Sequence, residues 1–179
     1  TYLLQIFAYL FITFNTVVTN FMKLLENKNI LIVGVANKHS IAAGIAESMA
    51  ENGANIALTY QNERLKGNVE KLGKEIGVEI FIPCDVSSDI EIKETFKNLA
   101  SHWEGLDAVI HAVGFAPREE LDGEFIDVTS REGFQIAHDV SSYSFIVLEK
   151  EAKKMMEGRN GSLLTLSYLL SLIHISEHT

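Results

Sequence analysis

The sequence predicts an α/β fold in which helices cover both faces of a parallel, doubly wound sheet. From Asn29 onward, short apolar runs alternate with amphipathic stretches, as in consecutive strand-helix-strand units. The first run, NILIVG (29–34), is apolar after its first residue, as expected for a parallel strand that is buried on both faces. Right-handed crossovers between such strands bring their carboxyl ends to one edge of the sheet, where these folds bind ligands.

Two strand-helix units make up the first half of this region. We expect strands at 29–34 and 54–60, with helices at 40–53 and 62–77. In the first helix, Ser40 is placed to act as the N-cap, and Gly53 can adopt the left-handed conformation at the C-terminal end. Helical spacing predicts a shared apolar face for this helix, consisting of Ile41, Ile45, Ala46 and Met49.

The second half repeats the pattern with a longer insertion. The expected strands are 78–86, 106–114 and 161–167, and the expected helices are 87–105 and a longer segment that runs through Lys154. A polar stretch at 115–133 precedes that last helix. We find no internal repeat and no low-complexity linker.

Composition favours small-molecule chemistry in a reducing compartment. The 179 residues suffice for one domain, and the formal net charge of -9 argues against binding to nucleic acid or to an anionic membrane. Cys84 is the single cysteine, so no internal disulfide can form, which favours a cytoplasmic location. No metal site is indicated.

The first 21 residues differ from the rest because they carry no charge and are about long enough to span a bilayer as a helix. They lack the positive n-region and the cleavage site of a signal peptide. Met22 and Lys23, followed by a strand pattern, resemble a natural start. We therefore interpret residues 1–21 as a non-native or upstream extension, with a membrane-associated helix as the alternative.

The turn after the first strand, GVANKHSIAAGIA (34–46), could hold a pyrophosphate on backbone amides at a helix N-terminus. Gly34 permits a tight turn, and Ser40 and Ile41 are expected to offer the first free amides. Ala42 and Gly44 are small enough for close packing of the helix on the sheet. The alternative is a serine-capped helix without a ligand.

The end of the second strand bears on the choice of nicotinamide cofactor. Gln61 can hydrogen-bond a ribose hydroxyl, which favours NADH. Arg64 and Lys66 lie close enough in sequence to keep NADPH open, although both could simply form a solvated helix face.

Polar residues also follow the third and fourth strands. Asp85 and the Val86 amide could recognise an adenine, unless Asp85 caps the next helix, a role also open to the two serines after it. Gly114 allows close backbone approach to a cofactor ribose. His111 could act as an acid or base, but a histidine at the end of an apolar strand is more often packed and hydrogen-bonded.

Candidate ligand-binding residues follow four successive strands, and together they indicate a resemblance to a known family. The chain resembles the enoyl-acyl carrier protein reductases, a divergent branch of the Rossmann-like short-chain dehydrogenases/reductases, over roughly Met22 to Leu169. The motifs are GVANKHSIAAGIA, LTYQNERLKG, CDVSSD, HAVGFAP, LDGEF, TSREGFQIAHDVSSYSF and LLTLSYL. The resemblance implies pyrophosphate binding by Gly34, Ser40 and Ile41, ribose binding by Gln61, adenine binding by Asp85 and Val86, a nicotinamide region at Val113 and Gly114, an acyl pocket at Ala116, and an active-site tyrosine at Tyr168.

The implied reaction is hydride transfer from NADH to a trans-2-enoyl thioester of acyl carrier protein in fatty-acid biosynthesis. The implied parent is a homotetramer whose second tyrosine and lysine protonate the enolate. Neither residue follows Leu169, so we expect a partial, C-terminally incomplete domain (22–169), a non-matching tail (170–179) and an inactive chain. The alternatives are a ketoreductase of the same superfamily and a non-catalytic dinucleotide-binding module.

Overall fold

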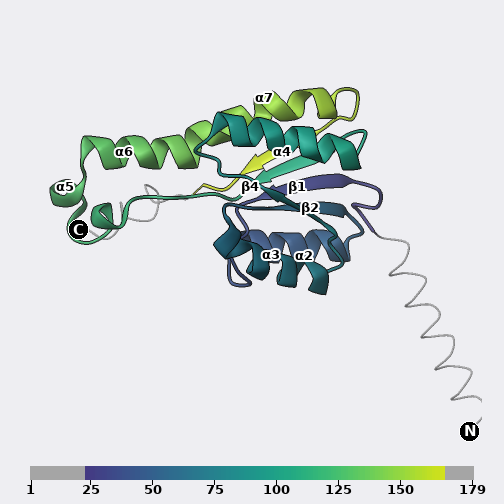
Figure 1. Cartoon of the computed structure of the whole chain (residues 1–179), viewed down its shortest axis with the longest axis horizontal. Helices are drawn as coiled ribbons and strands as arrows, with labels where there is room; N and C mark the ends of the chain where they lie inside the picture. The colour runs from purple at the N-terminus through teal and green to yellow at the C-terminus, as the bar shows by residue number, and fades with distance from the viewer. Residues whose placement is uncertain (1–22, 168–179) are drawn as a thin grey trace, which may run out of the picture.

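The structure is a computed structural model that describes residues 23–167. Five strands form one sheet in the order β3-β2-β1-β4-β5, and every neighbouring pair is parallel (Figure 1). The strands are β1 (Asn29–Val33), β2 (Asn55–Tyr60), β3 (Ile80–Pro83), β4 (Ala108–His111) and β5 (Ser162–Thr165). The predicted α/β fold with a doubly wound parallel sheet is confirmed.

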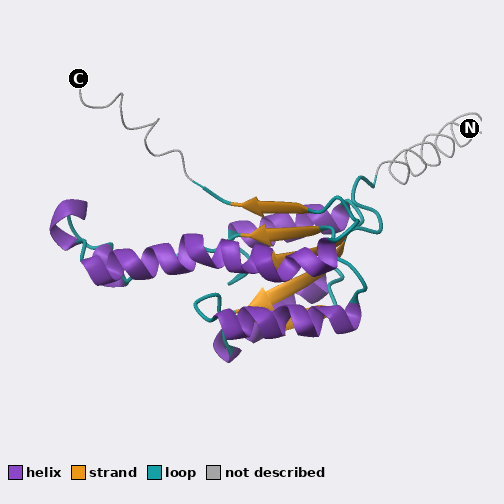
Figure 2. Ribbon diagram, turned by 90° about the horizontal axis from the view of Figure 1, so that it is seen from above, coloured by secondary structure: helices purple, strands orange, loops and turns teal. Residues whose placement is uncertain are grey.

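Helices lie on both faces of the sheet (Figures 1 and 2). One face carries α2 (Ile41–Glu51) and α3 (Glu63–Glu75), and the other carries α4 (Asp89–His102) and α7 (Ser144–Met156). Successive side chains of a strand point to opposite faces, so a central strand must be apolar throughout. In β1, Ile30 and Ile32 pack with the α2 and α3 side, while Leu31 and Val33 pack with the α4 and α7 side.

The predicted apolar face of α2 is confirmed at Ile45, Ala46 and Met49, which pack in the core, but not at Ile41. Its buried residues are alanines, namely Ala42, Ala43 and Ala46, whereas Ile41 is 69% exposed. Gly44 is also exposed, and a Cβ there would meet nothing within 4 Å, so the expected close contact with the sheet at Gly44 is wrong. Gly53 has the predicted left-handed conformation, with φ +88.

The predicted polar stretch and the following helical segment form an arm that extends away from the sheet (Figures 1 and 2). Its parts are η1 (Arg118–Glu120), α5 (Phe125–Val128), α6 (Arg131–His138) and a π-helical turn, η2 (Asp139–Tyr143), which continues into α7. The Glu120 carboxylate accepts hydrogen bonds from the Ser130 amide and hydroxyl at 2.9 and 2.6 Å. This contact fixes η1 against the start of α6.

No helix within residues 23–167 has both the length and the apolar character needed to cross a bilayer. The proposed extension at 1–21, Tyr168 and the tail at 170–179 lie outside the described residues.

Candidate functional site

A cavity of about 360 Å³ lies where the carboxyl ends of β1 to β4 meet. Such strand ends are the usual ligand-binding edge of a doubly wound sheet. Six of the predicted site residues line this cleft: Gly34, Gln61, Asp85, Val86, Val113 and Gly114. Ser40, Ile41 and Ala116 are not among its lining residues, and Tyr168 lies outside the described part of the chain.

Several lining residues escaped sequence reasoning. Thr59, Leu65 and Cys84 come from β2, α3 and the end of β3, Phe115 comes from the loop after β4, and Ile136 and Val140 come from α6 and η2. Ile136 and Val140 are four positions apart on a helical segment, a spacing that places them on one face. The sequence showed that spacing but not that the segment would reach back to the cleft.

Gly34 allows the first turn to approach the loop after β4. Its φ is +110, and a Cβ at this position would collide with the Ala112 carbonyl. The neighbouring Ala112 amide donates to the Val33 carbonyl at 2.9 Å, which holds the two loops together. Only glycine fits both the backbone conformation and the space.

At the N-terminus of α2, the structure differs in one detail from the predicted phosphate site. The Ser40 amide and hydroxyl both donate to the Asn37 carbonyl, at 3.1 and 2.7 Å, so the Ser40 amide is not free and its side chain does not cap the helix. The amides of Ile41 and Ala42, by contrast, have no backbone acceptor within residues 23–167. The amides at the start of α2 available to an anion are therefore those of Ile41 and Ala42.

Asp85 forms a turn rather than a helix cap. One carboxylate oxygen accepts from the Ser87 amide and hydroxyl at 3.0 and 2.7 Å, and the other has a long contact of 3.4 Å from the Gln61 side-chain amide. Burial alone would raise the pKa of Asp85, but these hydrogen bonds outweigh it and lower the pKa, so the group is an anion at neutral pH. Ser88 caps α4 by accepting from the Glu91 amide.

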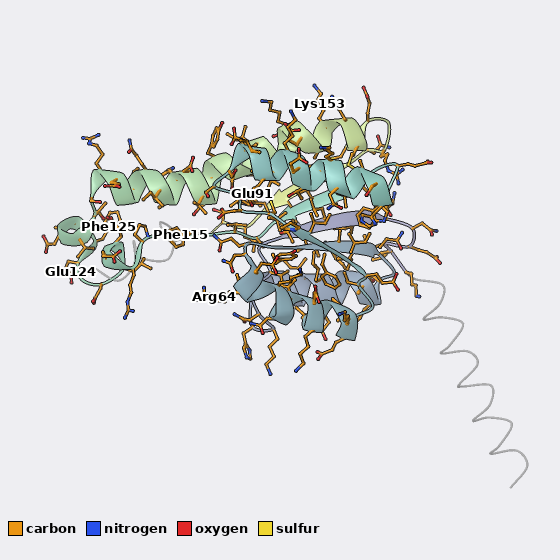
Figure 3. The ribbon with its side chains drawn as sticks, viewed as in Figure 1. Arg64, Glu91, Phe115, Glu124, Phe125 and Lys153 are labelled. Carbon is orange, nitrogen blue, oxygen red and sulfur yellow. The ribbon has the colours of Figure 1, made fainter. Side chains whose placement is uncertain are left out.

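The two basic residues near Gln61 differ in their surroundings. Lys66 forms an ion pair with Glu63 at 3.4 Å and lies 5.5 Å from the centre of the Tyr60 ring. The hydrogen bond and charge of Glu63 raise the pKa of Lys66. Arg64, at the start of α3, is exposed and forms no salt bridge within residues 23–167 (Figure 3). The Glu63 carboxylate therefore partly offsets the positive charge of Lys66, whereas Arg64 has no ion-pair partner within residues 23–167.

His111 is packed and hydrogen-bonded, as predicted. The ring is fully buried, and its nitrogens lie 2.9 Å from the Thr165 hydroxyl and 2.9 Å from the Ser144 hydroxyl. Burial lowers the pKa of His111. Cys84 is also buried, and desolvation raises the pKa of its thiol to about 11. Within residues 23–167, no group of three or more metal-ligating side chains is present.

Comparisons with known proteins agree with this geometry. A family model described as enoyl-(acyl carrier protein) reductase matches residues 34–179. The NADH-dependent enoyl-[acyl-carrier-protein] reductase of Salmonella typhimurium is 47% identical over 148 residues, which cover 83% of this chain and 56% of that protein. The corresponding reductase of Neisseria meningitidis is also 47% identical, and the match covers 57% of its length. The chain thus spans about half the length of these relatives.

The chain also superposes on solved structures of enoyl-acyl carrier protein reductases. The NADH-type reductase of Aquifex aeolicus superposes with a TM-score of 0.78 at 49% identity, covering 81% of this chain and 57% of that chain. The reductase of Anaplasma phagocytophilum, solved in complex with NAD, superposes with a TM-score of 0.76 at 43% identity, covering 81% of this chain and 55% of that chain.

Proposed function

Because the chain belongs to the enoyl-acyl carrier protein reductase family, we propose that it forms the dinucleotide-binding part of an NADH-dependent enoyl-thioester reductase. The observation that carries this proposal is the cleft at four strand ends, lined by residues that come in the order a dinucleotide requires. The parent reaction is hydride transfer to a trans-2-enoyl thioester of acyl carrier protein in fatty-acid biosynthesis.

The free polar groups of the cleft, together with those at the start of α2 outside its lining, fit such a cofactor. The Ile41 and Ala42 amides at the start of α2 would hold the pyrophosphate, helped by the helix dipole. Gln61 would hydrogen-bond the adenosine ribose, and the Asp85 oxygen that now has only the 3.4 Å contact would accept from the adenine amino group. The buried Val86 would contact the adenine, and Val113 and Gly114 would lie toward the nicotinamide.

NADH is preferred over NADPH because the ribose end of the cleft offers little positive charge. Gln61 is neutral, and the Lys66 ammonium is paired with the Glu63 carboxylate. Glu63 would also repel a 2′-phosphate. Arg64 remains as the one basic group there that has no ion pair within the described residues. We expect the chain to bind NADH at least about tenfold more tightly than NADPH, a difference of about 1.4 kcal/mol.

The bound cofactor would supply the hydride for the β-carbon of the enoyl group. Ala116, half-buried on the loop after β4, would line the acyl pocket beyond the cleft, and Tyr168 would stand close to the substrate. An enolate forms as the hydride arrives, and it needs a hydroxyl and a cation to stabilise and protonate it. The resemblance assigns this step to a second tyrosine and a lysine, so the function we propose for residues 1–179 is binding of the cofactor.

The proposed partner is acyl carrier protein with its thioester, the proposed assembly of the parent enzyme is a homotetramer, and the proposed location is the cytoplasm. Domain boundaries at 22–169 are part of the same proposal. Family membership supports the thioester substrate.

Two titrations of the chain test this function. Calorimetry with NADH and with NADPH measures the cofactor preference, and Gln61→Arg should narrow or reverse it. A crotonyl thioester is then added to the NADH-bound chain, and NADH absorbance is followed. Tight NADH binding is expected. Absence of NADH binding would refute the proposed function, while rapid oxidation would show that the chain contains its own proton donor.

A further inference from the structure

Three segments of the site meet at the buried ring of His111. In the sheet, His111 is the last residue of β4 and pairs with Val33 on one side and Thr165 on the other. Its Nδ1 lies 2.9 Å from the Thr165 hydroxyl, and its Nε2 lies 2.9 Å from the Ser144 hydroxyl. The Phe145 ring lies beside it, with the two ring centres 5.5 Å apart. None of the functions described above uses this cluster.

The direction of each hydrogen bond follows from the number of protons available. The Ser144 hydroxyl donates its one hydrogen to the Val140 carbonyl at 2.7 Å, so it can only accept from the imidazole. Nε2 must therefore carry a hydrogen. In a neutral ring Nδ1 is then an acceptor, and the Thr165 hydroxyl donates to it. The result is one directed chain from Thr165 through His111 and Ser144 to Val140.

The neutral form is the one this environment favours. Burial lowers the pKa of His111, and no charged group among the described residues contributes to the shift. A protonated ring would donate from both nitrogens. The Thr165 hydroxyl would then have to accept the hydrogen on Nδ1 and donate its own hydrogen to a different acceptor.

The hydrogen-bond chain ends in an irregular part of the helix. Val140 lies in η2, the π-helical turn, and its side chain lines the cleft. Such turns are rare and occur often at functional sites. Ser144 holds the Val140 carbonyl from one side, and Ser141 of the same turn binds the Phe115 amide and carbonyl at 3.0 and 3.2 Å. The π-helical turn is therefore tied both to His111 and to the loop that follows it.

We propose that His111, as the Nε2–H tautomer, is a positioning residue that sets the wall of the cleft at its nicotinamide end. It couples the loop at 113–115, the cleft-lining turn at Val140 and the end of β5, whose Thr165 lies three residues before Tyr168. The assignment of that end to the nicotinamide rests on the proposed function. The hydrogen-bond chain from Thr165 to Val140 does not depend on the proposed function.

Two measurements on the intact chain test this role. Long-range ¹H–¹⁵N spectra report the His111 tautomer directly, and amide shifts at 113–115 report the loop without any cofactor. The variant Ser144→Ala removes the acceptor for Nε2–H, and Ser142→Ala, in the same helical segment, is the matched control. Thr165→Val removes the donor to Nδ1, and Thr165→Ser should restore it.

We expect an Nε2–H signal in the unmodified chain and partial conversion to the Nδ1–H tautomer in Ser144→Ala. Ser144→Ala should also shift the 113–115 amides and weaken NADH binding about fivefold, whereas Ser142→Ala should do neither. A charged or Nδ1–H ring in the unmodified chain overturns the inference, as does identical behaviour of the two alanine variants at 113–115. If the unmodified chain does not bind NADH, the proposed function fails, while the tautomer and the amide shifts still decide the role of His111.

Discussion

At the scale of single residues, Gly34 is the position where the cleft tolerates least change. We expect Gly34→Ala to lower the free energy of unfolding by about 1–3 kcal/mol, because alanine is strained at this φ and its Cβ meets the Ala112 carbonyl. Gly44→Ala is the matched control, because Gly44 lies exposed in a helix interior. There alanine should raise the free energy of unfolding by roughly 0.5–1 kcal/mol. Urea unfolding measures both, and equal effects of the same sign would contradict this explanation.

Cys84 lines the cleft but should be chemically inert. Thiolates react with iodoacetamide and thiols hardly do, and burial raises the pKa of this thiol to about 11. At pH 8 we therefore expect no alkylation of the folded chain and full alkylation in urea, measured by mass spectrometry. Rapid labelling of the folded chain would mean that the thiol is exposed or ionised.

The candidate site was predictable where a residue's role depends on its place along a strand. Gln61, Asp85 and Gly114 each follow an apolar run, and parallel strands bring such positions to one edge. The cap pattern predicts a free amide at Ser40, because it does not reveal the tight turn in which this amide donates to the Asn37 carbonyl. Local contacts of this kind depend on backbone angles that the residue types alone leave open.

At the scale of elements, a cluster at Asp107 joins β1, β4 and the turn after α7. Its carboxylate accepts from Lys28 at 3.2 Å, from the Asn29 amide at 3.0 Å and from Arg159 at 2.9 Å. Burial alone would raise the pKa of Asp107, but the hydrogen bonds from Arg159, Asn29 and Lys28 outweigh it and lower the pKa to about 2. The cluster fixes the amino-terminal edge of the sheet, opposite the cleft.

This cluster predicts a loss of stability in acid. Between pH 4 and 2 the unfolded chain binds a proton at Asp107 and the folded chain does not, so the free energy of unfolding falls as the pH falls through this window. After discounting for screening of the partly exposed Lys28 and Arg159, we expect a contribution on the order of 1–2 kcal/mol. Asp107→Asn should remove this part of the pH dependence, and Asp122→Asn, on an exposed turn, should leave it unchanged. Urea unfolding at several pH values tests this.

Element boundaries were less predictable than element order. All five strands lie within their predicted ranges, but β3 ends at Pro83, whereas the apolar pattern suggested a strand through Val86. The last bond of this edge strand to β2 runs from the Cys84 amide to the Tyr60 carbonyl at 2.9 Å, and Cys84, Asp85 and Val86 then line the cleft. In α2, Ala42, Ala43 and Ala46 are buried and Ile45 and Met49 pack at the edge of the core, whereas Ile41, in the first turn, is exposed. Packing of this kind depends on tertiary structure and outweighs helical periodicity.

At the scale of the whole molecule, the arm exposes apolar side chains. Leu121, Phe125 and Ile126 are 71, 69 and 86% exposed, and Phe125 lies toward the far end of the arm in Figure 3. Exposed apolar patches of this kind favour association. We expect the chain to self-associate as its concentration rises, as measured by sedimentation velocity, and Ile126→Glu to reduce this. A monodisperse monomer at all concentrations would contradict this expectation.

We expect residues 23–167 to form a cleft that binds NADH along the carboxyl edge of the sheet. The most direct measurement is an NADH titration of the ¹⁵N-labelled chain, followed by amide chemical shifts. We predict saturable shifts at Gly34, Ile41, Gln61, Val86 and Gly114, which lie at or beside the strand ends. Absence of saturable shifts, or shifts confined to the amino-terminal edge around Asp107, would contradict the claim.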